Sequence, residues 1–241
     1  MTPPADSPAA HDPADPACVI LLTGRAAPLG DSGRPSAIAK TPVAGPLILG
    51  PEGLAGDEQA DRRVHGGTEK ALHHYPADHY PSWLAELGPL PALTRPGGFG
   101  ENLSAHGLTE TTVAVGDIFR LGRALIQVSQ GRQPCWKLNH RFGIPDMARR
   151  VQQTGRTGWY YRTLEPGTVT SGDRLELVDR LAPDWPLARL WRALYVDVMN
   201  LSELRAIAAL EVLADGWRKH AARRVASGEV EDWRPRLEGR A

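Results

Sequence analysis

The stretch that decides the fold runs from Gly98 to His140 and reads GFGENLSAHGLTETTVAVGDIFRLGRALIQVSQGRQPCWKLNH. Near its end, the segment Ala124–Ser129 places small and branched apolar side chains at every second position. Such alternation is typical of a strand with one face buried in a core. Pro134 follows and restricts the residue before it to extended geometry. We therefore expect Cys135 to lie on the rigid end of a strand.

Cys135 is one of only two cysteines in the chain of 241 residues. Arg132 and Lys137 flank it, and nearby cations favour the thiolate that binds metals or attacks electrophiles. The alternative is a small buried side chain in the wall of a barrel. The other cysteine, Cys18, begins an apolar run, where we expect a packing residue because a reduced cysteine behaves as a small hydrophobe.

Three further patches accompany the cysteine segment: Pro35–Lys40, the run GLAGDEQADRRVHGG from Gly53 to Gly67, and Phe99–Leu103. In this order and combination they resemble the MOSC domain, named for the C-terminal part of molybdenum cofactor sulfurase. The similarity is greatest to its stand-alone bacterial branch, the YiiM-type proteins, and extends from about Leu22 to the C-terminal helices. The resemblance implies a mixed α/β, β-rich fold, in which a MOSC-type β-barrel with inserted helices precedes a small C-terminal three-helix unit.

The resemblance also implies a molybdenum cofactor (Mo-molybdopterin), with Cys135 as the catalytic residue and the metal ligand. A thiolate is a soft ligand, and one suffices here because the dithiolene of the pterin supplies two further sulfurs. The other candidate cofactor-binding residues are Lys40, His65, Gly66, Gly67, Asn102, Arg132 and Gln133. Arginine offers a planar fork to a phosphate and lysine a point charge, while glycines expose backbone N–H groups to an anion.

Proteins of this type reduce N-hydroxylated compounds, so the resemblance implies a reductase of hydroxylaminopurine-type base analogues and hydroxylamines. The alternative is a carrier or binding module that holds the cofactor without turnover. The sequence has no Walker-type loop, no G-x-G-x-x-G after a strand, and too few cysteines for a four-thiolate iron–sulfur site. We therefore expect a separate protein, a flavoprotein reductase, to supply the electrons.

Two other site chemistries compete with molybdenum. Cys135 could form a zinc site together with four histidines, His65, His73, His74 and His79. No H-E-x-x-H motif and no paired C-x-x-C spacing supports such a site. Cys135 could also be a nucleophile partnered by His65 or His140, although no peptidase signature surrounds it. We expect Asp57 to be a structural turn residue rather than an acid–base catalyst.

Composition narrows the class of partner. The chain has 28 basic and 28 acidic residues and no net charge, whereas a protein that binds a nucleic acid duplex usually has a basic surplus. No apolar stretch approaches the roughly 20 residues needed to span a bilayer. The first residues lack a basic start and an apolar run, so we expect neither a signal peptide nor an anchor, and a cytoplasmic location.

The chain divides by composition into a disordered leader at residues 1–17, the barrel domain at 18–181 and the helical domain at 182–241. Within the barrel we expect helices after Tyr80, ending before Gly88, and from Pro145 to before Gly155. The C-terminal helices are expected at 186–199, 202–214 and 216–226, with Ser202 and Asp215 as N-caps and Gly228 as the stop.

Overall fold

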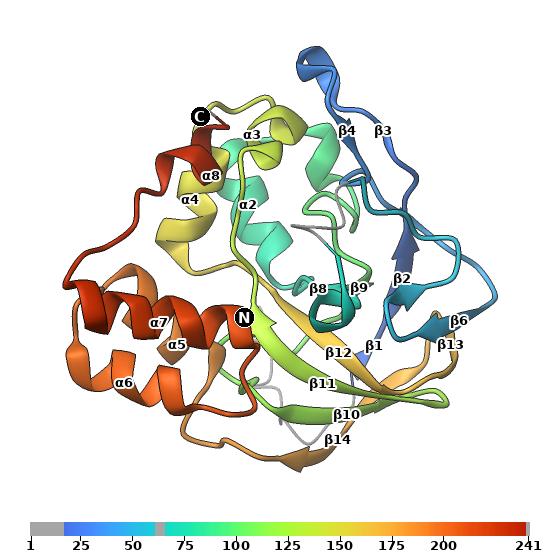
Figure 1. The fold of residues 1–241 in the computed structure, drawn as a ribbon. Coiled ribbons are helices and arrows are strands. Elements are labelled where there is room, and N and C mark those ends of the chain that lie inside the picture. Colours follow the sequence, from blue (N-terminus) through green and yellow to red (C-terminus); the bar gives the residue numbers. More distant parts are fainter. Residues whose placement is uncertain (1–16, 61–65, 240–241) are drawn as a thin grey trace, which may run out of the picture.

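The computed structural model describes residues 17–60 and 66–239. His65 lies outside the described residues, and so does the predicted leader at residues 1–17 except for Ala17. Ala17 begins a short edge strand. Figure 1 shows a strongly curled sheet with helices against one side and a group of C-terminal helices at one edge. This is the mixed α/β fold with a C-terminal helical unit that the sequence predicts.

The main sheet has the order β1-β14-β10-β11-β12-β8-β9-β2-β5, antiparallel throughout except for the parallel pair β8 and β9. Its strands are β1 (Ala17–Cys18), β2 (Ile20–Thr23), β5 (Thr41–Pro42), β8 (Leu72–His74), β9 (Leu103–Ser104), β10 (Asp117–Leu121), β11 (Ala124–Gly131), β12 (Trp159–Glu165) and β14 (Arg174–Arg180). Two small sheets flank it, formed by β6 (Pro46–Gly50), β7 (Gly53–Leu54) and β13 (Gly167–Thr170), and by the hairpin of β3 (Ala27–Pro28) and β4 (Pro35–Ser36).

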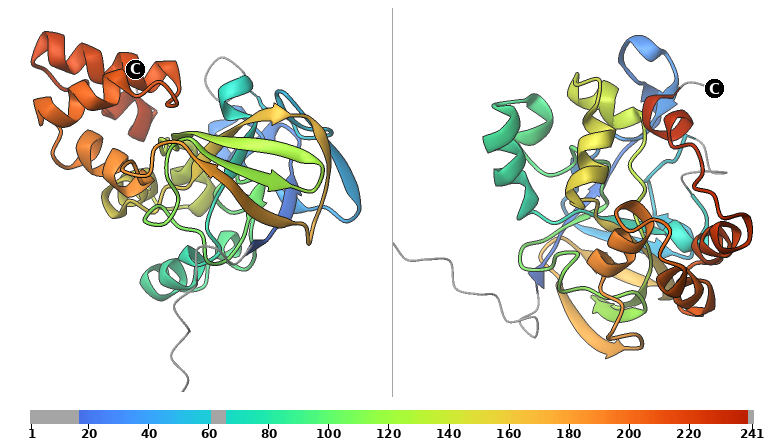
Figure 2. Two further views of the ribbon diagram at one scale, coloured as in Figure 1. Left: turned by 90° about the horizontal axis from the view of Figure 1, so that it is seen from below. Right: turned by 90° about the vertical axis from the view of Figure 1, so that its left-hand side faces the viewer.

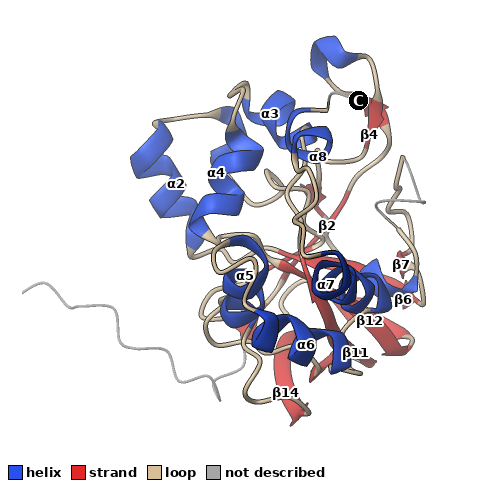
Figure 3. Cartoon of the chain, turned by 60° about the vertical axis from the view of Figure 1, so that its left-hand side comes forward, coloured by secondary structure: helices blue, strands red, loops and turns tan. Residues whose placement is uncertain are grey.

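The helices lie in two groups, which Figure 3 separates. The first is α2 (His79–Leu87), α3 (Lys137–Phe142), α4 (Met147–Thr154) and the terminal α8 (Arg234–Glu238), and the second is α5 (Leu187–Tyr195), α6 (Leu201–Ala209) and α7 (Asp215–Ser227). Short 3-10 turns occur at Gly30–Ser32, Thr68–Lys70 and Pro91–Leu93. Within the described residues, no helix has the length and apolar character needed to cross a membrane.

Two apolar clusters hold these layers together. The larger one fills the curled sheet and continues into α5, α6 and α7, so the second group of helices shares a core with the sheet. Figure 2, seen from below, shows these helices to one side of the curled sheet. The smaller cluster centres on Phe99, whose ring stacks on that of Tyr75 at 3.9 Å between centroids, and gathers α2, α3, α4 and α8. The cysteine segment runs between the two clusters, because β11 contributes to the first and α3 to the second.

Most predicted elements are confirmed, with local differences. The strand at 124–129 is β11, the helix before Gly88 is α2, and Gly228 ends α7 in the left-handed conformation. The helix predicted from Pro145 begins at Met147 instead.

The predicted N-caps in the C-terminal unit are wrong. Asn200, not Ser202, caps α6, since its side chain accepts the Glu203 N–H at 3.2 Å. Ala214 occupies the cap position of α7, where its own N–H donates to the Ser129 carbonyl of β11. Asp215 is instead the first residue of the helix, where its carboxylate is in the first turn.

Candidate functional site

Cys135 lies in a short loop between two rigid elements. β11 ends at Gly131, residues 132–136 cross to the next layer, and α3 begins at Lys137. The backbone of Arg132 donates to the carbonyl of Gly158 at 3.0 Å, which ties the start of the loop to the residue just before β12. Cys135 is half-buried, and its carbonyl accepts the Leu138 N–H at 2.9 Å, which makes it the start of the first turn of α3.

Cys18 differs from Cys135 in its position in the fold and in its exposure. It lies in β1, at the edge of the sheet, where only Arg174 of β14 pairs with it. The prediction that Cys18 is a packing residue is wrong, since its side chain is exposed. The apolar run is real, but the alternation of the strand turns Cys18 to solvent and its neighbour Val19 into the core.

Cys135 opens onto a cleft of about 570 Å³, its open mouth included. The cleft is formed by the hairpin of β3 and β4, the loop before β8, the loop at Phe99–Asn102 and the cysteine loop. Its lining residues are Ser36, Ala37, Ile38, Lys40, Glu58, Gln59, Ala60, Lys70, His73, Phe99, Gly100, Asn102, Arg132, Cys135, Lys137 and Tyr160.

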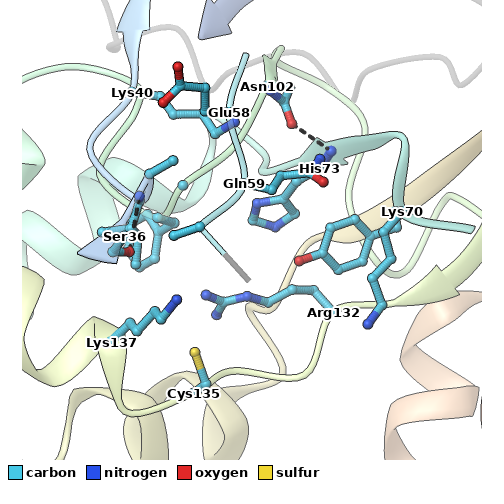
Figure 4. A pocket seen from close by; sticks show the side chains of 16 residues that line it. Ser36, Lys40, Glu58, Gln59, Lys70, His73, Asn102, Arg132, Cys135 and Lys137 are labelled. Atoms are coloured by element: carbon cyan, nitrogen blue, oxygen red, sulfur yellow. Dashed lines mark hydrogen bonds between the residues drawn. The ribbon is translucent and has the colours of Figure 1, made fainter. Parts of the chain in front are cut away.

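Cations dominate the floor of the cleft. Figure 4 shows the amine of Lys137 and the guanidinium of Arg132 converging above the thiol of Cys135. Both side chains are buried, with Arg132 only 5% exposed. Among the described residues, Arg132 Nη1 has no hydrogen-bond partner although it is shielded from solvent. A buried guanidinium N–H without an acceptor is costly, so this arm of Arg132 is suited to an anionic ligand.

Lys70 adds a third cation to the rim. It lies at the end of the 3-10 turn Thr68–Lys70, and its amine is 6.0 Å from the ring centroid of Tyr160. Desolvation lowers the pKa of the Lys70 amine, and the negative charge of a Cys135 thiolate would act in the opposite direction. Burial raises the pKa of the Tyr160 hydroxyl, which therefore stays protonated at neutral pH.

Lys40 and Asn102 belong to the wall of the cleft. Lys40 forms an ion pair with Asp57, and both side chains are almost fully buried. The same Asp57 carboxylate accepts the Gly24 N–H at 2.8 Å and the Asn102 amide at 2.9 Å. Asp57 is thus a structural hub that joins three segments. Burial lowers the pKa of Lys40, while Asp57 and then Glu101 act against that shift.

The amide of Asn102 is fully engaged by protein partners. Its Nδ2 donates to the Leu22 carbonyl at 3.2 Å as well as to Asp57, and its Oδ1 accepts the backbone N–H of His73 at 3.2 Å. Asn102 therefore fixes the strand that carries His73. Burial and then Arg132 lower the pKa of His73 well below its ordinary value, so this imidazole at the cleft is neutral.

Three of the remaining predicted binding residues, Gly66, Gly67 and Gln133, are not among the residues that line the cleft. Gln133 points away from it and donates to the hydroxyl of Tyr195 on α5 at 2.8 Å. Gly67 adopts a φ of 93°, which favours glycine, and precedes the turn that carries Lys70. Neither Gly66 nor Gly67 lines the cleft, and His65 lies outside the described residues. Roles for these four residues stay predictions without support from the geometry.

Two of the three described histidines that suggested zinc, His74 and His79, have partners away from Cys135. His79 pairs with Glu110 at 2.7 Å, and His74 stacks on Trp159 at 4.3 Å and contacts the Tyr161 hydroxyl. Across residues 17–60 and 66–239, no three His, Cys, Asp or Glu side chains are grouped so as to hold a metal ion. His140, a possible partner of a nucleophile, packs on the ring of Trp136 and does not line the cleft.

Sequence reasoning missed several residues of the cleft. Lys70 and Tyr160 come from segments whose sequence patterns resemble ordinary turns and strands, and Ser36 was noted only as part of the patch Pro35–Lys40. Lys137 was recognised only as a neighbouring cation of Cys135. Its position in the first turn of α3 is what turns it into the cleft, and that helix of six residues was not predicted.

Comparison with known proteins places this site in a family. The model described as MOSC domain matches residues 61–176, and that described as YiiM-like, 3-alpha helix domain matches residues 185–228. The chain therefore belongs to the MOSC domain family, whose members are associated with binding of the molybdenum cofactor.

Within that family, the chain belongs with the YiiM-like proteins. It is 44% identical over 211 residues to Protein YiiM of Escherichia coli, across 86% of this chain and 92% of the relative. The crystal structure of YiiM from Escherichia coli superposes with a TM-score of 0.79 at 36% identity, covering 92% of this chain and 98% of that one. A protein of Gibberella moniliformis named Reductase is 41% identical over 170 residues, which are 70% of this chain and 30% of the relative.

Proposed function

We propose that this protein is a molybdenum-cofactor-dependent reductase of N-hydroxylated compounds, in which Cys135 is the protein ligand of molybdenum. Hydroxylaminopurine-type bases and hydroxylamines are the substrates that the proposal names. Family membership supports the cofactor, and the fungal relative named Reductase supports redox turnover.

One observation carries the proposal: a thiol that opens onto a cleft beneath two converging buried cations. The residues fit the cofactor, because a dithiolene-bound metal needs one soft protein ligand and a pterin phosphate needs cationic donors. Arg132 Nη1, shielded and without a protein acceptor among the described residues, is such a donor. The cofactor, when bound, supplies two-electron chemistry at the metal.

Each residue then has a distinct task. Cys135 would hold the metal from a loop that is tied to Gly158, just before β12. Arg132 and Lys137 would receive the phosphate, with the fork of the guanidinium setting its orientation. Lys70 and the buried, neutral His73 also line the cleft, where they would border a bound substrate. Lys40, Asp57 and Asn102 keep the wall rigid through buried hydrogen bonds.

The second candidate is a carrier that holds the cofactor without turnover. Nothing in the cleft separates it from a reductase, since both need the same ligand and the same cations. Electron supply from a separate reductase, expected to be a flavoprotein, is part of the reductase proposal.

Turnover by two matched cysteine variants tests the proposal. Protein loaded with cofactor in a competent host is assayed with an artificial electron donor and a hydroxylaminopurine. Cys18→Ser should turn over at close to the wild-type rate, because Cys18 is exposed at a sheet edge. Cys135→Ser should lose nearly all activity, because a hydroxyl stays protonated and is a poor ligand for molybdenum. Full activity of the folded Cys135→Ser variant would refute the assignment, and cofactor binding without any wild-type turnover would favour the carrier.

A further inference from the structure

The chain returns to the cysteine loop after its last long helix. We define the C-terminal strap as residues 229–239, which lead from α7 to α8. Figure 3 shows α8 next to α3 and α4, on the side of the molecule away from α6. The strap is therefore the part of the C-terminal unit that reaches back across to the first group of helices.

The strap is anchored at both ends. At its start, the carboxylate of Glu231 accepts two hydrogen bonds from Arg224 of α7, at 3.0 and 2.7 Å. Arg224 is itself only 1% exposed, and it also donates to the Leu194 carbonyl of α5. At the other end, Leu237 is buried in the apolar cluster around Phe99. These contacts fix the path of α8 relative to both groups of helices.

The strap binds the cysteine loop on each side of Cys135. On the N-terminal side, Nη1 of Arg236 donates to the carbonyl of Pro134. On the C-terminal side, the Trp136 N–H donates to the Arg236 carbonyl at 2.8 Å. Asn139 of α3 adds a third bond by donating to the Leu237 carbonyl at 2.9 Å. One residue of the strap, Arg236, thus contacts both neighbours of the cysteine.

The fork of Arg236 also joins the loop to α4. Its Nη2 donates to Oε1 of the buried Gln152 at 2.6 Å while Nη1 holds Pro134. A lysine would keep the charge but could not span two acceptors in this fixed geometry. Arg236 does not line the cleft, so it would act on a ligand only through the loop.

We propose that Arg236 is a positioning residue for Cys135, and that the C-terminal unit uses the strap to hold the cysteine loop in its binding geometry. The inference deepens the proposed function, because it names the device that places the proposed metal ligand. It concerns the protein itself and can be tested without cofactor.

Hydrogen exchange and thiol reactivity provide the test on the full chain without cofactor, in a Cys18→Ser background. Arg236→Lys and Arg236→Gln each remove the fork. Each should speed amide exchange at residues 133–139 by roughly tenfold or more, because loss of a charge-assisted bond raises the population of the open loop. In Arg236→Lys the charge remains, so Cys135 should also react faster with neutral iodoacetamide. Molybdenum content after expression in a competent host should fall in both variants.

Two controls separate positioning from general destabilisation. Arg234→Gln alters the same helix at an exposed ion pair with Asp232 and should leave exchange and thiol reactivity unchanged. Leu204→Ala weakens the buried face of α6 and should lower the melting temperature without selective exchange at residues 133–139.

Unchanged exchange and thiol reactivity in both Arg236 variants would overturn the inference, as would full rescue by lysine. Equal exchange in Leu204→Ala would overturn it too, by showing a structural effect only. If the loop responds as expected but wild-type protein never acquires molybdenum, the proposed function fails while the positioning role stands.

Discussion

The buried pair of Lys40 and Asp57 allows a quantitative test of how the cleft is built. Replacing Lys40 by Met leaves the Asp57 carboxylate, 3% exposed, with two neutral hydrogen-bond donors and no counter-charge. Breaking a buried pair by removing one partner costs about 3–5 kcal/mol. For a chain of this size, 1 kcal/mol corresponds to about 2–4 °C, so the melting temperature should fall by roughly 6–20 °C.

The double variant Lys40→Met/Asp57→Asn should recover most of this loss, because no unpaired charge then remains. Asp57→Asn alone instead leaves the buried ammonium group of Lys40 without a counter-charge. Since burial already lowers the pKa of Lys40, that variant can release its proton on folding, and its deficit should shrink as the pH rises. Thermal unfolding of the four proteins at several pH values measures both effects.

Two results would refute this reasoning. Strictly additive losses in the double variant would mean that the two charges are not coupled. A folded, fully stable Asp57→Asn protein without turnover would make Asp57 a catalytic group rather than a structural one.

Three further predictions concern cofactor, electrons and pH. Arg132→Ala should reduce the amount of bound pterin while changing the melting temperature little, because a charge-assisted bond to phosphate is worth about 1.5–3 kcal/mol. Normal pterin occupancy with a lower melting temperature would instead show that Arg132 has a structural role. With NADH and no second protein, the loaded enzyme should not reduce a hydroxylamine, and steady turnover would contradict the need for a donor. Burial, followed by His79, lowers the pKa of His74 to about 3. Its contribution to stability is therefore complete above the unfolded pKa near 6.5 and is lost as the pH falls below it, by about 2 kcal/mol between pH 6.5 and 4.5. Urea unfolding should show this fall, and an equally steep fall in His74→Asn would assign it elsewhere.

The sequence predicted the strand before Cys135 because alternation is a local property. Cys135 and Arg132 line one cleft, because only two residues separate them on a loop that its backbone contacts restrain. The exposure of Cys18 was not predictable from its run, because only the pairing of β1 with β14 decides which face it takes. Gln133 faces α5 and not the cleft for a similar reason. Its partner Tyr195 is distant in the sequence, and only the tertiary fold brings the two side chains together.

The contact between the C-terminal strap and the cysteine loop was the feature that the sequence predicted least. Arg236 is separated from Pro134 by 102 positions, and α8 is a helix of five residues without a clear periodic signal. Lys70 likewise reaches the cleft only because β8, which follows its turn, pairs with β12. Local pattern drew attention to Cys135 and its neighbouring cations Arg132 and Lys137, while tertiary packing brings Lys70 to the same cleft.

Metal and pterin analysis of the wild type and of Cys135→Ser, both purified from a host that makes the molybdenum cofactor, tests whether Cys135 binds molybdenum. We expect molybdenum and pterin in about equal amounts in the wild type, with little zinc, and a marked loss of molybdenum in Cys135→Ser. Stoichiometric zinc without pterin in the wild type, or undiminished molybdenum in the variant, would contradict it.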